Sequence, residues 1–154
     1  MRLFKKIILG GLGVFVLLQL IQPQKNESTL SFDNTKIQGV PDNVQVILKN
    51  ACYDCHSNNT NYPWYSSIQP VAFMLNRHIF DGKEQLNFDE FLTYSFKKQF
   101  NKIKSIGQQI KDDEMPLKSY RWIHTEARLT DNEKALLVQW SDSTYNKLKS
   151  KSGN

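Results

Sequence analysis

The chain opens with a continuous apolar run that differs from every later segment. Residues 7–21 (IILGGLGVFVLLQLI) carry no charge, and they follow a start that holds three cations and no acid. This order is typical of an export signal or a membrane anchor. The run is short for a spanning helix, which needs about 20 residues, although flanking lysines can snorkel. Because no small-residue cleavage pattern follows, we expect residues 1–23 to be an uncleaved signal anchor, with a cleaved signal peptide as the alternative.

After the apolar run the pattern becomes polar and irregular, and then helical. Residues 24–40 are polar and lack periodicity, so they predict a flexible tether. Over residues 41–148 the apolar side chains recur three and four positions apart, the spacing of amphipathic helices. No segment alternates as a strand does. We therefore expect one all-α domain of four or five helices, followed by a disordered tail over residues 149–154.

The ends of several helices can be placed from the residues that favour them. Proline suits the first position of a helix, and Pro41 precedes an apolar face that ends at Ala51. Thr130 and Glu133 form a capping-box pair before the last helix. Between these we expect short helices over residues 71–80 and 87–92, divided by Asp81-Gly82, and a longer amphipathic helix over residues 96–110.

Composition and charge narrow the classes of function. The 154 residues are 40% hydrophobic and 23% charged, as in an ordinary globular protein, and the net charge is +5 at pH 7. Three of the cations belong to the N-terminal start, which leaves +2 for the rest of the chain. Because this excess is small and the sequence has no arginine-rich stripe or base-stacking repeat, we expect no nucleic-acid partner. The sequence sets no oligomeric state.

The candidate chemistry centres on residues 52–56 (CYDCH), a CxxCH sequence typical of covalent haem attachment. Two cysteines three positions apart near a helix end lie on one side of the chain, where both sulfurs can reach the vinyl groups of one haem. The histidine that follows is then carried under the iron. We therefore predict one haem c per chain, bound by Cys52, Cys55 and His56.

Three other interpretations of the CxxCH residues stay open. A thioredoxin-like dithiol needs a preceding strand, whereas the pattern here predicts a helix before the motif. A zinc site would have to take adjacent Cys and His residues as ligands, and no second cysteine pair completes it. The third is a plain disulfide between Cys52 and Cys55, which would make the protein a haem-free interaction domain.

A haem that only passes electrons needs a second axial ligand, and four residues are candidates. Met115 lies in a polar loop and is followed by a proline that stiffens this loop, so its thioether can point into a crevice without disturbing a helix. We predict that Met115 is the distal ligand and that it coordinates the iron together with His56. Ligation by His78 is the alternative, while His124 is expected to be a hydrogen-bonding loop residue and Met74 a core residue.

A set of residues extends the pattern well beyond CxxCH. It comprises residues 51–57 (ACYDCHS), 61–65 (NYPWY), 78–82 (HIFDG), 86–88 (LNF), Met115-Pro116, Tyr120, His124, Leu129 and Trp140. With these residues the chain resembles the haem-binding domain family, small exported bacterial proteins related to c-type cytochromes. The resemblance implies a cytochrome c-like helical fold around covalent haem, without naming a reaction. The chain departs from the family pattern at Pro116-Leu117, because the family often has a second proline where this chain has Leu117.

Together these features predict a monohaem cytochrome-like protein of the cell envelope that transfers single electrons. Residues 1–23 would anchor it in the inner membrane with the haem domain in the periplasm, or export it if they are cleaved. Its partners would be envelope redox proteins. Four lysines, Lys97, Lys98, Lys102 and Lys104, either steer such a partner or form the solvated face of a helix. The alternative is a haem enzyme or gas sensor with an open distal site, although no catalytic motif independent of haem is present and we expect no enzyme.

Overall fold

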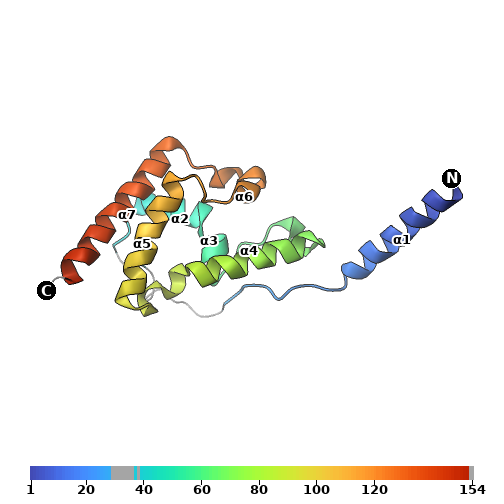
Figure 1. The fold of residues 1–154 in the computed structure, drawn as a ribbon, viewed down its shortest axis with the longest axis horizontal. Coiled ribbons are helices and arrows are strands. Elements are labelled where there is room, and N and C mark those ends of the chain that lie inside the picture. Colours follow the sequence, from blue (N-terminus) through green and yellow to red (C-terminus); the bar gives the residue numbers. More distant parts are fainter. Residues whose placement is uncertain (29–36, 38, 153–154) are drawn as a thin grey trace.

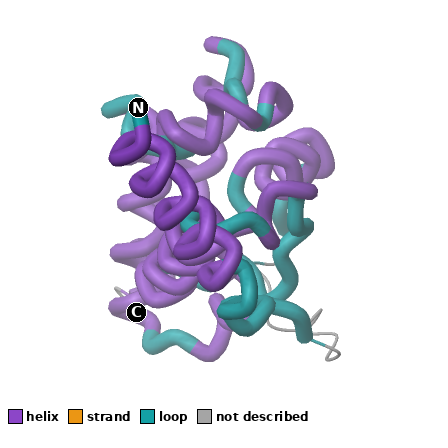
Figure 2. The backbone as a smooth tube through the Cα atoms, turned by 90° about the vertical axis from the view of Figure 1, so that its right-hand side faces the viewer, coloured by secondary structure: helices purple, strands orange, loops and turns teal. Residues whose placement is uncertain are grey.

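The computed structural model describes residues 1–28, 37 and 39–152, and within them every regular element is a helix (Figure 1, Figure 2). The prediction of an all-α protein is therefore confirmed. The α-helices are α1 (Arg2–Leu18), α2 (Asp42–Ala51), α3 (Tyr53–His56), α4 (Val71–Gln85), α5 (Phe96–Lys111), α6 (Lys118–Ile123) and α7 (Asp131–Ser152). Three 3₁₀ helices complete the order: η1 (Trp64–Ser67), η2 (Phe88–Thr93) and η3 (Thr125–Ala127).

The hydrophobic core forms where α2, α5 and α7 meet. Helices α5 and α7 run side by side (Figure 1), and α2 packs on α7. At their crossing, Gly107 N donates a hydrogen bond to Ser141 Oγ (3.1 Å), and this hydroxyl donates to the carbonyl of Ile103 (2.6 Å). A Cβ at Gly107 would stand 2.8 Å from Ser141 Oγ, so glycine permits the close approach. The core cluster consists of Val44, Ile47, Leu48, Leu86, Phe88, Phe91, Ile103, Ile110, Leu137 and Trp140.

Three predicted helices are confirmed together with their packing faces or caps. Helix α2 buries one apolar face, and Pro41 stands at its N-cap, one position before the predicted start. Helix α5 covers the expected amphipathic segment. At the start of α7, Thr130 N donates to Glu133 Oε2 (2.8 Å) and Glu133 N donates to Thr130 Oγ1 (3.3 Å), which completes the capping box. Helix α7 continues to Ser152 and so includes part of the predicted tail.

The prediction of two short helices divided by Asp81-Gly82 is wrong. Helix α4 runs unbroken through both residues, and the second expected helix is the 3₁₀ helix η2. The reason is that Gly82 lies at a close contact between two helices, where a Cβ would stand 2.6 Å from the carbonyl oxygen of Cys55. Glycine thus lets α4 approach α3 and does not end the helix. After α1, the described residues hold six α-helices in place of four or five, because α3 and α6 are too short to show a period.

The N-terminal segment consists of an exposed helix and a stretch that contacts the domain. Helix α1 extends away from the domain and buries none of its residues (Figure 1). No described helix has the length and apolar character needed to cross a membrane, so the expected spanning anchor is unsupported. The described start of the tether is bound to the domain, because Asn26 N donates to Tyr62 Oη (2.6 Å) and Asn26 Nδ2 donates to Ser57 O (2.9 Å). Most of the predicted tether, residues 29–36 and 38, lies outside the described residues.

Candidate haem site

Residues 52–56 form a tight turn at the junction of α2 and α3, facing α4. Cys52 N donates to Leu48 O (2.9 Å) and so continues the hydrogen bonding of α2. Cys55 N and His56 N both donate to the carbonyl of Cys52, at 3.2 and 3.0 Å. This turn places both thiols and the imidazole on the wall of one cavity. The local spacing of the motif therefore brings Cys52, Cys55 and His56 to one cavity.

The imidazole of His56 is held in one orientation. Its Nδ1 lies 2.9 Å from the carbonyl oxygen of Leu86. Because a carbonyl only accepts, the neutral ring carries its proton on Nδ1 and keeps a lone pair on Nε2, the form in which histidine binds a metal. Burial lowers the pKa of His56, against the opposing effect of the Leu86 carbonyl, and so favours this neutral form.

A buried polar network holds Leu86 in place beside the motif. Asn58 N donates to Asp89 Oδ2 (2.8 Å), and Asn87 Nδ2 donates to Asn58 Oδ1 (2.8 Å). Asp89 N in turn donates to Asn87 Oδ1 (3.1 Å). These hydrogen bonds connect Asn87, the residue after Leu86, to Asn58, which lies two residues after His56. Sequence reasoning missed this support, although the short LNF segment of the resemblance contains two of the residues involved.

The two thiols are unsuited to dithiol redox chemistry. Burial raises the pKa of Cys52 to about 12 and that of Cys55 to about 11, with a smaller contribution from the neighbouring Cys55 and Asp54 charges respectively. Redox-active cysteines have lowered values, so the thioredoxin-like interpretation loses its basis. Both are free thiols in the structure. In the part of the chain that the structure describes, no group of three or more His, Cys, Asp or Glu residues is placed to hold a metal ion, so zinc gains no support.

Two adjoining cavities extend from the CxxCH residues, and they have volumes of about 300 and 330 Å³. Both reach the lower end of the usual range for ligand sites, and together they fall well inside it. Cys52, His56 and Met115 line both cavities, and Cys55 lines the second. A space of this size, walled by two thiols, a metal-competent imidazole and a thioether, fits the donor set that covalent haem requires.

Met115 is presented by a loop that charged contacts hold in place. Asp113 has a φ of 56°, a left-handed conformation that Asp tolerates better than most residues. Its carboxylate accepts two hydrogen bonds from Arg121 (3.0 Å each) and one from Lys134 (2.7 Å). These contacts, first with Arg121 and then with Lys134, lower the pKa of Asp113. The loop is therefore tied to α6 and α7, two residues before Met115.

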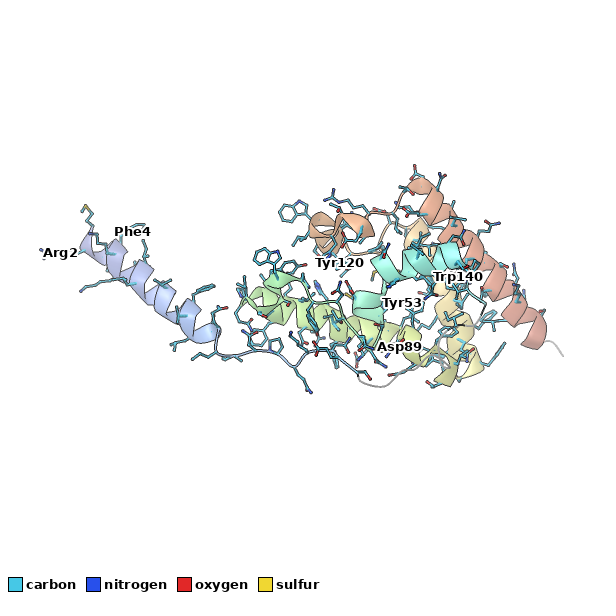
Figure 3. The ribbon with its side chains drawn as sticks, turned by 180° about the vertical axis from the view of Figure 1, so that it is seen from behind. Arg2, Phe4, Tyr53, Asp89, Tyr120 and Trp140 are labelled. Atoms are coloured by element: carbon cyan, nitrogen blue, oxygen red, sulfur yellow. The ribbon has the colours of Figure 1, made fainter. Side chains whose placement is uncertain are left out.

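The other candidate ligands are placed differently. His78 lines the second cavity together with Met115. His124 lies outside both cavities, and its Nε2 is 2.6 Å from Tyr65 Oη, so it is a hydrogen-bonding residue as predicted. Met74 was predicted to be in the core, but it is 55% exposed. Tyr120 belongs to α6 (Figure 3), and its hydroxyl donates to Asp54 Oδ2 of α3 (2.6 Å) at the wall of the second cavity.

Fold and site together define a small helical domain built around a crevice with thiol, imidazole and thioether groups. The sequence model of the haem-binding domain matches residues 13–143, which is most of the chain, and the protein belongs to this family. The resemblance inferred from the sequence is thereby confirmed. No curated protein and no solved structure gives a significant match. The matched region begins inside α1, so it includes the segment around Asn26 that is bound to the domain.

Proposed function

We propose that the protein is a monohaem c-type cytochrome of the cell envelope that transfers single electrons, with His56 and Met115 as axial ligands. One observation carries this proposal: His56, whose Nδ1 is engaged by Leu86 O and whose Nε2 keeps its lone pair, lines the same cavity as Cys52 and Met115. Membership of the haem-binding domain family supports haem as the cofactor. When bound, haem supplies an iron that alternates between the ferrous and ferric states.

The cysteines attach the cofactor by an addition that needs no oxidant or reductant. The thiols of Cys52 and Cys55 would each add across one vinyl C=C bond, with sulfur bonding to the carbon next to the ring and the thiol hydrogen bonding to the terminal carbon. The raised pKa values of Cys52 and Cys55 keep these groups as thiols until attachment. His56 would hold the iron as a neutral imidazole. The apolar side chains around Met115 limit the water that reaches the crevice, which favours the reduced state.

We also propose that residues 1–23 direct export of the domain to the cell envelope. Three cations and no acid precede the apolar run, and α1 leaves its apolar side chains exposed. A covalently bound cofactor cannot dissociate, which suits a small domain that works outside the cytoplasm. Envelope redox proteins are the partners that this location offers.

Haem staining after denaturing electrophoresis tests covalent attachment. The full-length protein, made with a c-type maturation system, is compared with the double variant Cys52→Ala, Cys55→Ala. We expect a stained band that the variant lacks. An unstained wild-type band would overturn the proposal and return attention to a disulfide-linked domain.

Carbon monoxide binding then tests the distal ligand. Met115→Ala should lose the near-infrared sulfur-to-iron band of the ferric protein and bind carbon monoxide readily when reduced. Met74→Ala is the matched control, because Met74 is exposed and lines neither cavity. If wild-type ferrous protein already binds carbon monoxide without denaturation, the second candidate function, an enzyme or gas sensor with an open distal site, replaces electron transfer. A spectrum that changes in His78→Ala and not in Met115→Ala would assign the ligand to His78, which also lines the second cavity.

A further inference from the structure

The two cavities differ in the charge of the side chains that line them. The first is lined along α5 by Lys102, Ser105 and Gln109, and none of its described lining residues is acidic. The second is lined by Asp54 and Asp81, and among its described lining residues there is no lysine or arginine. The first cavity therefore offers an anion one cation and two neutral donors. The second offers two carboxylates, of which Asp81 is already paired with Arg77 (2.9 Å), so an anionic group is favoured in the first cavity.

The cysteines orient the cofactor in the same sense. Cys52 lines both cavities, whereas Cys55 lines only the second. Haem carries its vinyl groups on one edge of the ring and its propionate groups on the opposite edge. Attachment through both thiols therefore directs the vinyl edge toward the second cavity, where Cys55 lies. The propionate edge is directed toward the first cavity, where Lys102 lies.

Resting on the proposed function, we propose that Lys102, together with Ser105 and Gln109, forms the binding site for the haem propionates. An ammonium, a hydroxyl and an amide are suitable donors to carboxylates, and hydrogen bonds to a charged acceptor are about twice as strong as neutral ones. In the structure, Lys102 Nζ donates to the neutral amide oxygen of Gln85 (3.3 Å), so its charge is available to an anion in the cavity.

Lys102 differs from the other lysines of α5. Lys97, Lys98 and Lys104 are exposed and line neither cavity, as expected for a solvated helix face. Lys102 is half-buried at the cavity wall. The four lysines thus have two roles, which their common position on one amphipathic helix did not reveal.

The test compares Lys102→Gln with Lys104→Gln in the full-length, haem-loaded protein. Both variants remove one positive charge from the same helix, so they match in net charge. We expect Lys102→Gln to shift the propionate bending bands of the resonance Raman spectrum and to lower the reduction potential. The potential falls because the propionate charge, no longer paired, stabilises the ferric state. The shift should be severalfold larger than for Lys104→Gln, whose Raman bands should match the wild type.

Haem staining of the same samples distinguishes failure of the propionate site from failure of the proposed function. If wild-type and variant proteins stain equally but Lys102→Gln shifts potential and Raman bands no more than Lys104→Gln, the propionate site is wrong and the proposed function stands. If the wild type does not stain, the proposed function fails, and this inference fails with it. Restoration of the wild-type Raman bands by Lys102→Arg would further support a direct cation–carboxylate contact.

Discussion

The two sides of the crevice are positioned by different physical means. His56 is held by a backbone carbonyl and by the close packing of α3 on α4, two contacts with the backbone in half-buried surroundings. Met115 is held by a polar loop that depends on ion pairs between Asp113 and two cations near the surface. Packing against a backbone has little freedom to adjust, whereas exposed ion pairs are weak and sensitive to salt. We therefore expect a rigid proximal side and an adjustable distal side.

The largest effect is expected at Gly82, where the proximal side is most tightly packed. An alanine in a helix interior normally stabilises by up to about 1 kcal/mol relative to glycine. In Gly82→Ala the new Cβ would meet the carbonyl oxygen of Cys55, so we expect a loss of about 2–3 kcal/mol in the free energy of unfolding. Urea unfolding measures this loss, and haem staining should show poor attachment.

Gly107→Ala is the control for the glycine substitution. Its Cβ would meet the side chain of Ser141 in the contact between α5 and α7, where no haem ligand is predicted. We expect this variant to lose stability but to retain haem attachment. Equal haem loading in Gly82→Ala and Gly107→Ala would contradict the idea that α4 packing positions the CxxCH residues.

A smaller and selective effect is expected on the distal side. Asp113→Asn removes the charge that Arg121 and Lys134 share but keeps a residue that tolerates the left-handed conformation. The sulfur-to-iron band should weaken and carbon monoxide should bind faster, while haem staining stays at the wild-type level. Asp113→Gly separates the two roles of the residue, because it removes the charge and relaxes the backbone. Full retention of the band in both variants would show that the loop needs no ion pairs.

The same contrast explains which features of the site could be predicted from the sequence. The CxxCH residues and the helix that precedes them are a local pattern, so their joint presence on one cavity wall could be predicted. The Leu86 carbonyl could not, because a backbone acceptor leaves no signature in the sequence. The sequence predicts a helix break at Gly82, because the low helix propensity of glycine is visible there and its contact with Cys55 is not.

The position of Met115 in a loop could be predicted from the sequence, whereas the contacts that support this loop could not. The pairing of Asp113 with Arg121 and Lys134 depends on how α6 and α7 return past the loop, which is a tertiary property. The environments of the α5 lysines could not be predicted for the same reason. The sequence places them on one helix face, whereas in the structure one is half-buried at the cavity wall and three are exposed. Helix caps can be predicted from the sequence, because both partners lie within one turn. The capping box of Thr130 and Glu133 is an example, and its hydrogen bonds are present in the structure.

That cap supplies the smallest expected effect and a check on the distal variants. Thr130→Ala removes the hydroxyl that accepts from Glu133 N, and we expect a loss of about 1 kcal/mol in the free energy of unfolding. Because the hydrogen bonds of Thr130 run to Glu133 and to Lys134 N and not to the loop of Met115, the sulfur-to-iron band should stay unchanged at temperatures well below the transition. Thermal unfolding and the ferric spectrum of one sample give both values. If the band weakens in Thr130→Ala as much as in Asp113→Asn, the distal ligand responds to general destabilisation of α7, and the ion pairs have no specific role in placing Met115.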